Sequence, residues 1–395
     1  MIVTKVNNLN SEIKNQLLKG EIFSFEDLDN CFVLPGFCDV HVHFREPGFE
    51  YKEDIKSGEE SAINGGYTTV FTMPNLKPVP DSFKNLKLQL DAINKVGKIE
   101  VIPYGSITKN QMGEELSDME DLAPYVCAFS DDGRGVQNGN MMESAMLKAK
   151  CLNKVIVAHC EDNSLLFGGY IHDGEYAKIN GHKGISSASE YKQIERDIEL
   201  VKKTGVKYHV CHISTKESVE VIRKAKSEGV DITCETGPHY LVFNDMMLSD
   251  DGKYKMNPPI RSEEDRLALI EGIKDGTIDM IATDHAPHSY EEKNKGLKGS
   301  LNGIVGLETA FPVLYTYLVK TGIITLEKLV ELMAINPRKR FNLQIKEDYS
   351  VWNLSSEYVI DSKKFKSKGK SSPFDGLKVY GKRIATIVDN KVLEE

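Results

Sequence analysis

Short runs of β-branched and aromatic residues alternate with amphipathic segments through most of the chain. Runs of this length, bounded by polar and turn-forming residues, are typical of buried strands. The eight predicted strands cover residues 37–44, 67–73, 100–104, 125–130, 155–159, 207–213, 230–235 and 279–283. Helical segments between consecutive strands favour parallel pairing, because a parallel connection has to cross over the sheet. The pattern therefore predicts an α/β protein.

The clearest amphipathic segment covers residues 189–203, where apolar residues recur with the period of an α-helix. The residues on its apolar face are Tyr191, Ile194, Ile198 and Val201. Ser187 and Glu190 stand three positions apart at its start, which is the spacing of a capping box. We expect a helix that begins at this box and packs one face on the sheet.

Eight strand–helix units match a (β/α)₈ barrel of the TIM type, which we predict over residues 36–342. A doubly wound open sheet is the alternative, but no glycine fingerprint follows an early strand. The active site of such a barrel lies at the carboxyl ends of its strands. The turn-rich residues 257–259 are expected to form a loop over that end.

Residues 1–35 and 343–395 fall outside the predicted barrel. Near the C-terminus, residues 383–388 and 390–393 form two short strand-like runs around Asp389. Neither segment could bury a core alone, so we expect the two to pair as one small β-rich module. The lysine-rich stretch KKFKSKGK at 363–370 is predicted to be a solvated loop, with a basic binding patch as the alternative.

The composition and net charge of the chain narrow the classes of function that it can have. The 395 residues are 40% hydrophobic and 28% charged, with a formal net charge of −9, which argues against nucleic acid as a partner. No apolar stretch approaches the roughly 20 residues that cross a bilayer, so we expect no membrane segment and a cytoplasmic protein. The seven cysteines are an odd number without a CxxC pair, and we predict reduced thiols, mostly in the core.

Metal-competent side chains stand at the ends of five predicted strands. His41 and His43 are two positions apart on the first strand, so both point to the same face. The others are Asp131 and Asp132 on the fourth strand, His159 on the fifth, His212 on the sixth and Asp284 on the eighth. One histidine at a strand end is usually structural, but five ends that meet at one barrel mouth indicate a metal centre.

Four imidazoles and two carboxylates suit two borderline metal ions, and Zn²⁺ fits them best. Two such ions about 3.5–4 Å apart would hold a hydroxide at neutral pH. Arg45 lies two positions beyond His43 and is a natural partner for a substrate carboxylate. The alternative for Arg45 is an ion pair with Glu46 or Glu53. His288 is a second polar residue of the predicted site, in the loop that follows Asp284.

With these residues in view, the chain resembles the dihydroorotases of the amidohydrolase superfamily, and in particular their longer bacterial type. The resemblance runs from about Leu34 to near the C-terminus. The motifs that carry it are HVHFREPG at 41–48, MPNLKPVPD at 73–81, FSDDG at 129–133, AHCE at 158–161, CHIST at 211–215, MNPPIR at 256–261, ATDHAPH at 282–288 with Lys293, and SKGKSSPF at 367–374.

This resemblance implies the reversible ring closure of N-carbamoyl-L-aspartate to (S)-dihydroorotate, a step of de novo pyrimidine biosynthesis. The implied ligands of two Zn²⁺ ions per subunit are His41, His43, Asp132, His159, His212 and Asp284. The implied substrate contacts are Arg45, Asn75, Asn257 and His288, with backbone groups of Gly303. In this scheme a hydroxide between the ions attacks the ring amide, and Asp284 is the general base and acid.

The chain departs from the family pattern in two places, and a third feature separates it from many members of the superfamily. The segment before the HVHFREPG motif is short, and residues 301–306 read LNGIVG where relatives commonly carry an aromatic residue before the glycine. Superfamily relatives often join their ions through a carboxylated lysine at the end of the fourth strand. That position reads FSDDG here, and Lys148 lies well into the next helical segment. We therefore predict an aspartate bridge, Asp132, with Asp131 turned away.

Two other functions fit part of this pattern. A hydantoinase, dihydropyrimidinase or allantoinase would share the architecture, but its ring carries no exocyclic carboxylate for Arg45 to bind. A non-catalytic scaffold would be marked by lost metal ligands, and all six ligand positions are filled here. The expected partner is a small-molecule substrate. The resemblance leaves open a homodimer and an association with aspartate carbamoyltransferase, as occurs for some relatives.

Overall fold

The computed structural model describes residues 3–6, 9, 11–19 and 31–393. Part of the predicted small module, at positions 1–2, 7–8, 10, 20–30 and 394–395, lies outside the described residues. Among the described helices, none combines the length and the apolar character that spanning a membrane requires. All seven cysteines are free and five are buried, as predicted.

Each of the eight predicted runs contains a strand. The strands are β3 (Phe37–Val42), β4 (Tyr67–Thr72), β5 (Glu100–Pro103), β6 (Ala128–Ser130), β7 (Val155–Ala158), β10 (Lys207–Val210), β11 (Ile232–Thr236) and β12 (Met280–Ile281). They pair in parallel in two sheets, β3–β4–β5 and β6–β7–β10–β11–β12. The predicted α/β class with parallel sheets is confirmed.

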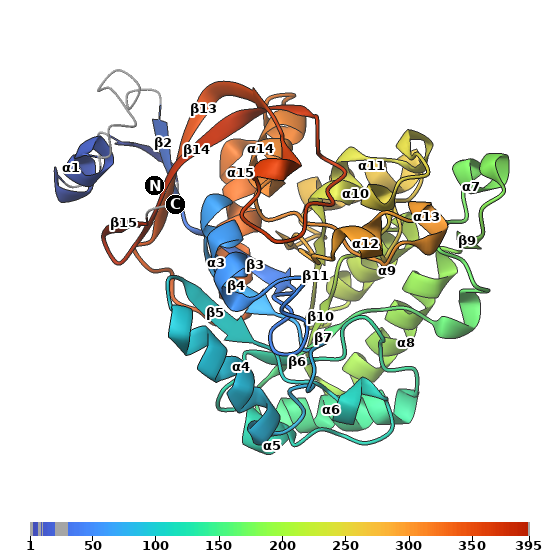
Figure 1. Cartoon of the computed structure of the whole chain (residues 1–395). Coiled ribbons are helices and arrows are strands. Elements are labelled where there is room, and N and C mark those ends of the chain that lie inside the picture. The colour runs from blue at the N-terminus through green and yellow to red at the C-terminus, as the bar shows by residue number, and fades with distance from the viewer. Residues whose placement is uncertain (1–2, 7–8, 10, 20–30, 394–395) are drawn as a thin grey trace.

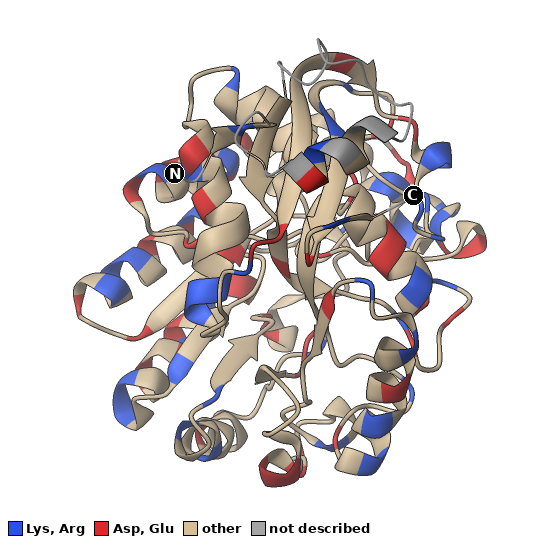
Figure 2. Ribbon diagram, turned by 90° about the vertical axis from the view of Figure 1, so that its left-hand side faces the viewer, with Lys and Arg blue, Asp and Glu red and all other residues tan. Residues whose placement is uncertain are grey.

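Helices lie around these strands (Figure 1). Those that follow the strands are α3 (Ile55–Asn64), α4 (Phe83–Val96), α5 (Met119–Leu122), α6 (Gly139–Cys151), α8 (Ala188–Thr204), α9 (Lys216–Ser227) and α11 (Glu263–Asp275). Others are α1 (Ser11–Lys19), α7 (Glu175–Asn180), α10 (Pro238–Val242), α12 (Tyr290–Lys293), α13 (Gly296–Gly299), α14 (Ala310–Leu314), α15 (Leu326–Val330) and α16 (Asn336–Arg340). Charged residues of both signs are interspersed over the outer helices (Figure 2).

Helix α8 confirms the predicted amphipathic helix, and its apolar residues Ile194, Ile198 and Val201 are buried. The predicted capping box is wrong. Ser187 has helical backbone angles, and its side chain makes no capping hydrogen bond. Glu190 instead accepts a hydrogen bond from the Ser214 backbone N–H at 2.9 Å. It also accepts hydrogen bonds from the hydroxyls of Thr215 and Ser218, which follow β10 in the chain. A buried carboxylate gains more from several tertiary donors than from one cap.

The two ends of the described chain form one antiparallel sheet, seen beside the main body in Figure 1. Its strands, in spatial order, are β1 (Thr4–Lys5), β2 (Cys31–Pro35), β13 (Tyr349–Val359), β14 (Lys378–Val388) and β15 (Lys391–Leu393). Strand β2, near the N-terminus, pairs with β13, near the C-terminus, and β13 was not among the predicted strands. Buried Trp352 on β13 packs on Phe311 and Phe37, which joins this sheet to the main body.

The lysine-rich stretch at 363–370 fits the solvated-loop prediction only in part. Its five lysines are exposed, but Ser367 and Gly369 are buried. The Ser367 hydroxyl and the Lys368 backbone N–H both donate hydrogen bonds to Glu53. Because a buried carboxylate needs donors, Glu53 draws this part of the loop inward. The loop prediction is therefore wrong for Ser367 and Gly369.

Candidate metal centre

The predicted site residues meet at the carboxyl ends of the parallel strands, around a cavity of about 210 Å³. The cavity is lined by His43, Arg45, Asn75, Asp132, Gly133, His159, His212, Asn257, Asp284, Ala286, His288, Asn302 and Gly303. Of the predicted residues, only His41 is missing from the lining. It is fully buried directly behind the cavity, with its Nε2 atom 3.3 Å from Asp132 Oδ1.

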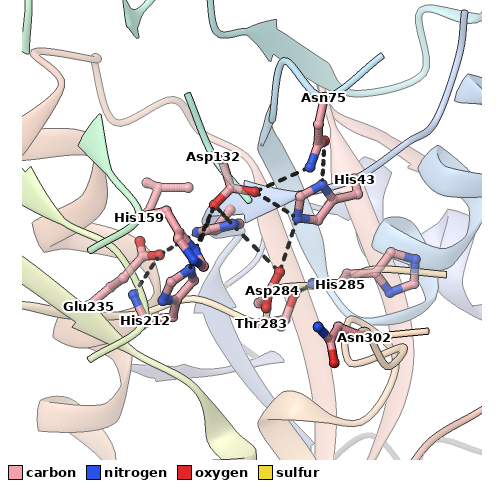
Figure 3. Close-up of polar contacts among 12 residues, drawn as sticks. His43, Asn75, Asp132, His159, His212, Glu235, Thr283, Asp284, His285 and Asn302 are labelled. Carbon is pink, nitrogen blue, oxygen red and sulfur yellow. Dashed lines mark hydrogen bonds and ion pairs between the residues drawn. The ribbon is translucent and has the colours of Figure 1, made fainter. Parts of the chain in front are cut away.

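Imidazoles and carboxylates crowd the floor of this cavity (Figure 3). His43 Nε2 lies 3.1 Å from Asp284 Oδ1, and His159 Nδ1 lies 2.9 Å from His212 Nε2. Burial alone would raise the pKa of Asp284, but His41 and His43 more than offset this effect and hold that pKa below its ordinary value. Asp284 is therefore ionised at neutral pH.

Several polar atoms at the centre are buried without a hydrogen-bond partner among the described residues. They are His41 Nε2, Asp132 Oδ1, His159 Nε2 and His212 Nδ1. Ligand atoms of His41, His43 and Asp132 lie within 4.8 Å of one another, as do those of Asp132, His159 and His212. Buried polar atoms without partners are costly, and a metal ion would satisfy them. The donor set fits bound metal, and the two groups share Asp132.

The two neighbouring aspartates at the end of β6 face opposite ways, as their alternation predicts. Asp131 accepts hydrogen bonds from the backbone of Ile107 at 2.8 Å and of Thr108 at 3.1 Å. Asp132 faces the histidines, and Lys148 is half-buried on α6, where it pairs with Glu120. Asp131 therefore supports the loop, while Asp132 is left for the centre.

Three of the predicted residues have a left-handed backbone. The φ angles are 59° for Arg45, 32° for His212 and 48° for Asp284. A non-glycine residue in this region stores strain of about 1–3 kcal/mol. All three residues line the cavity, and such backbone outliers cluster at functional sites.

Arg45 is buried and forms no ion pair in the part of the chain that the structure describes. Its Nε donates to the Pro287 carbonyl at 3.2 Å, and its Nη2 lies 3.4 Å from His288 Nε2. The alternative prediction of an ion pair with Glu46 or Glu53 is therefore not realised. A buried guanidinium without a carboxylate at the edge of a cavity is suited to an anionic ligand.

His288 stands beside Arg45 as a neutral ring. Burial, together with the positive charges of Arg45 and Lys52, lowers the pKa of His288 to about 3. Its Nε2 lies 2.8 Å from the Asn302 carbonyl and its Nδ1 lies 3.2 Å from Lys52 Nζ. The Asn302 carbonyl can only accept, so Nε2 is suited to donate to it, while Nδ1 also lies 3.3 Å from Glu292 Oε2. His288 thus holds the loop of Asn302 and Gly303 against the cavity.

The two predicted asparagines line the cavity but are also engaged by the protein. Asn75 Oδ1 lies 2.8 Å from His43 Nδ1, and Asn75 Nδ2 donates to Asp132 Oδ2 at 3.3 Å. Asn257 Nδ2 donates to Glu161 Oε1 at 2.9 Å. Asn75 therefore orients two candidate metal ligands, which sequence reasoning did not foresee.

Sequence reasoning also missed Glu235 at the end of β11. Its side chain is buried, with Oε1 2.7 Å from His41 Nδ1 and Oε2 3.0 Å from His209 Nε2. Burial would raise the pKa of Glu235, but His41 and His209 lower it to about 2. Glu235 ends a predicted strand, as the predicted ligands do, but nothing in the local sequence pairs it with His41.

Replacing Glu235 by alanine is expected to weaken metal binding about 10- to 100-fold, because Glu235 orients the His41 ring with Nε2 toward the centre. Metal retained after dialysis against a graded chelator measures this effect. Glu235→Gln, which still accepts a hydrogen bond, should restore part of the affinity. Glu59→Gln changes an equally buried carboxylate beside Lys98 and is the matched control. Equal metal retention in Glu235→Ala and wild type would refute this role.

Comparison with known proteins adds to this geometry. Residues 31–218 match the family model described as Dihydro-orotase-like. A dihydroorotase from Fusobacterium nucleatum is 52% identical over 93% of this chain and 88% of its own, and one from Bacillus subtilis is 49% identical with the same coverage. The L-hydantoinase of Arthrobacter aurescens has a TM-score of 0.78 and 28% identity over 92% of this chain and 85% of its own. A D-hydantoinase from a Bacillus species has a TM-score of 0.79 at 20% identity, over 92% and 86%.

The fold is thus that of the hydantoinases, and the cavity carries a donor set suited to metal. Fold and site together define a hydrolase of cyclic amides. Half of the positions are identical to dihydroorotases over nearly the whole chain. The chain belongs to the dihydroorotase family.

Proposed function

We propose that this enzyme interconverts (S)-dihydroorotate and N-carbamoyl-L-aspartate in de novo pyrimidine biosynthesis. The observation that carries the proposal is the buried, unpaired Arg45 at the edge of a cavity whose floor presents a metal-binding donor set. Both compounds combine a carboxylate with the amide or ureido group that reacts. A site for either compound therefore needs a cationic side chain for the carboxylate next to a catalytic centre for the amide or ureido group.

The proposed framework is a closed (β/α)₈ barrel over residues 36–342, with residues 1–35 and 343–395 as the attached β-rich module. Isolated parallel bridges between Gly105 and Phe129 and between Val42 and His285 support closure, because they link the edges of the two parallel sheets. Closure brings His41, on β3, beside Asp132, which follows β6.

Two metal ions, which we propose to be Zn²⁺, would be held by the six predicted ligands. These ligands are His41, His43, Asp132, His159, His212 and Asp284. When bound, the ions would polarise the ring carbonyl and make water a nucleophile at neutral pH. Asp132 belongs to both ligand groups and is the proposed bridge.

The substrate would be oriented by the predicted contact residues that line the same cavity. Arg45 would bind the exocyclic carboxylate, and His288 would add a neutral polar contact beside it. Asn257 and the backbone of Gly303 would contact the rest of the ring from the two mouth loops. Fixing the ring in one orientation accelerates the reaction by removing the entropy cost of alignment.

Asp284 is the proposed general base and acid. Its ionised carboxylate would accept a proton from the attacking water and deliver it to the departing ring nitrogen. Ring closure would be the reverse, with Asp284 accepting the proton from the ureido nitrogen and delivering it to the departing hydroxide, which leaves as water. The lowered pKa of Asp284 keeps the base form available in the hydrolytic direction.

The two directions are expected to respond oppositely to pH, because hydrolysis creates a carboxylate and releases a proton. The equilibrium should shift toward N-carbamoyl-aspartate by about tenfold per pH unit. Ring opening should rise and then level off from neutral to alkaline pH, while ring closure falls. Initial rates in both directions across this range test the prediction. Parallel profiles would contradict a single site that serves both directions.

The other cyclic amidases remain the second candidate, because the solved structures reported above are hydantoinases. Arg45 distinguishes the candidates, since hydantoin, dihydrouracil and allantoin lack the carboxylate that it would bind. Purified protein should be assayed side by side on dihydroorotate, dihydrouracil and allantoin. We expect turnover of dihydroorotate to exceed the others by orders of magnitude. Preference for either neutral ring would overturn the proposed substrate.

A further inference from the structure

A second and larger hollow lies at the opposite end of the parallel strands from the metal centre. Its volume is about 830 Å³, compared with about 210 Å³ for the catalytic cavity. Lys207 on its wall is the first residue of β10, whereas His212 at the catalytic cavity follows the end of that strand. The proposed chemistry leaves this hollow without a role.

Four of the five charged residues that line this hollow are cations. Lys154, Lys207, Lys339 and Arg340 line it together with one acidic residue, Asp279. Arg340 is neutralised by an ion pair with Asp231, and Asp279 is neutralised by Lys226 at 2.6 Å. The remaining three lysines have no carboxylate partner within the described part of the chain. The hollow therefore carries about three uncompensated positive charges.

The hydrogen bonds of these lysines do not neutralise them. Lys154 Nζ donates to the Val126 carbonyl at 2.7 Å, and Lys207 Nζ donates to Asn153 Oδ1 at 3.1 Å. Both acceptors are uncharged. Burial lowers the pKa of Lys154, which means that its surroundings disfavour the charged ammonium. An anion in the hollow would relieve this penalty and the repulsion among the lysines.

The rest of the protein makes this charge distribution unusual. The chain has a net charge of −9, and both signs are interspersed over the outer helices (Figure 2). The hollow also offers neutral groups, because the half-buried ring of Phe341 and the exposed amides of Asn153 and Asn342 line it. An aromatic ring with nearby amides suits a planar group that has hydrogen-bonding edges.

We infer that this hollow binds a nucleoside di- or triphosphate, with its phosphates on Lys154, Lys207 and Lys339 and its base toward Phe341. Ammonium groups bind phosphate oxygens through charge-assisted hydrogen bonds. The volume is more than a bare pyrophosphate needs, which favours a ligand with an organic part. All nucleoside di- and triphosphates share a group of negatively charged phosphates, which is the part that the lysines would bind.

Calorimetric titration of the metal-loaded protein tests the inference, with ATP, inorganic pyrophosphate and adenosine as probes. We expect saturable binding of ATP, weaker binding of pyrophosphate and none of adenosine. Metal content measured before and after titration excludes stripping of the centre. Equal affinities for ATP and pyrophosphate would overturn the nucleotide assignment, and absence of saturable binding would overturn the site.

Matched triple variants locate the binding. Lys154→Gln, Lys207→Gln and Lys339→Gln combined should weaken ATP binding at least about tenfold. Lys363→Gln, Lys364→Gln and Lys366→Gln remove the same charge from the exposed loop and should leave ATP affinity unchanged. Unchanged melting temperature in both proteins confirms folding. Equal losses in the two variants, or full binding by the first, would place the anion elsewhere and refute the inference.

Discussion

Replacing Arg45 by methionine is expected to lower kcat/KM for dihydroorotate by about 30- to 5,000-fold. Loss of a buried arginine–carboxylate contact leaves the substrate carboxylate unpaired, which costs about 2–5 kcal/mol of transition-state binding. Bound metal should stay normal, because Arg45 contacts Pro287 and His288 and forms no ion pair with a candidate ligand among the described residues. Steady-state kinetics with parallel metal analysis measures both quantities.

Arg45→Lys is the matched control for this prediction. It keeps the positive charge but loses the planar fork that pairs with a carboxylate, so an intermediate efficiency is expected. Any residual activity on a neutral ring such as dihydrouracil should be affected little by either substitution. If Arg45→Met retains near-normal efficiency on dihydroorotate with normal metal, the substrate clamp is assigned to the wrong residue.

Replacing Asp132 by alanine is expected to remove most of the bound metal and to lower kcat/KM at least about 100-fold. Asp132 is shared by the group of His41 and His43 and the group of His159 and His212, so its loss weakens both. An aspartate bridge needs no CO₂, and bicarbonate should neither rescue this variant nor activate the metal-free protein during reconstitution. Metal content and activity, each with and without bicarbonate, measure the effect.

The neighbouring Asp131 provides the control. Asp131→Ala removes hydrogen bonds to the backbone of Ile107 and Thr108, and we expect a loss of about 1–3 kcal/mol in the free energy of unfolding. Its metal content should fall less than that of Asp132→Ala. A larger metal loss from Asp131→Ala, or reconstitution that depends on bicarbonate, would reverse the assignment of the two aspartates.

The strands and most of the candidate site were predictable for the same reason. Apolar runs marked the strands, and polar residues such as His159 and Asp284 stood where those runs ended. The alternation of side chains along a strand also predicted that only one of Asp131 and Asp132 faces the centre, and the resemblance to the family selected Asp132. These are local features, and tertiary packing did not override them.

The missed features depend on contacts between distant segments. Glu235 acts on His41, which is 194 positions away, and nothing in the local sequence pairs them. Glu190 does not form the predicted capping box, because its carboxylate accepts hydrogen bonds from the segment that follows β10. Strand β13 carries too many serine and asparagine residues for a clear pattern, and its pairing with β2 and β14 fixes it.

The most direct test of the central claim is the rate of dihydroorotate hydrolysis by purified protein as a function of its bound metal. Metal-free protein is expected to be folded and inactive. Activity should return in proportion to added Zn²⁺ and reach its maximum at two ions per chain. Full turnover by metal-free protein, or no turnover of dihydroorotate by protein that holds two ions, would contradict a metal-dependent dihydroorotase.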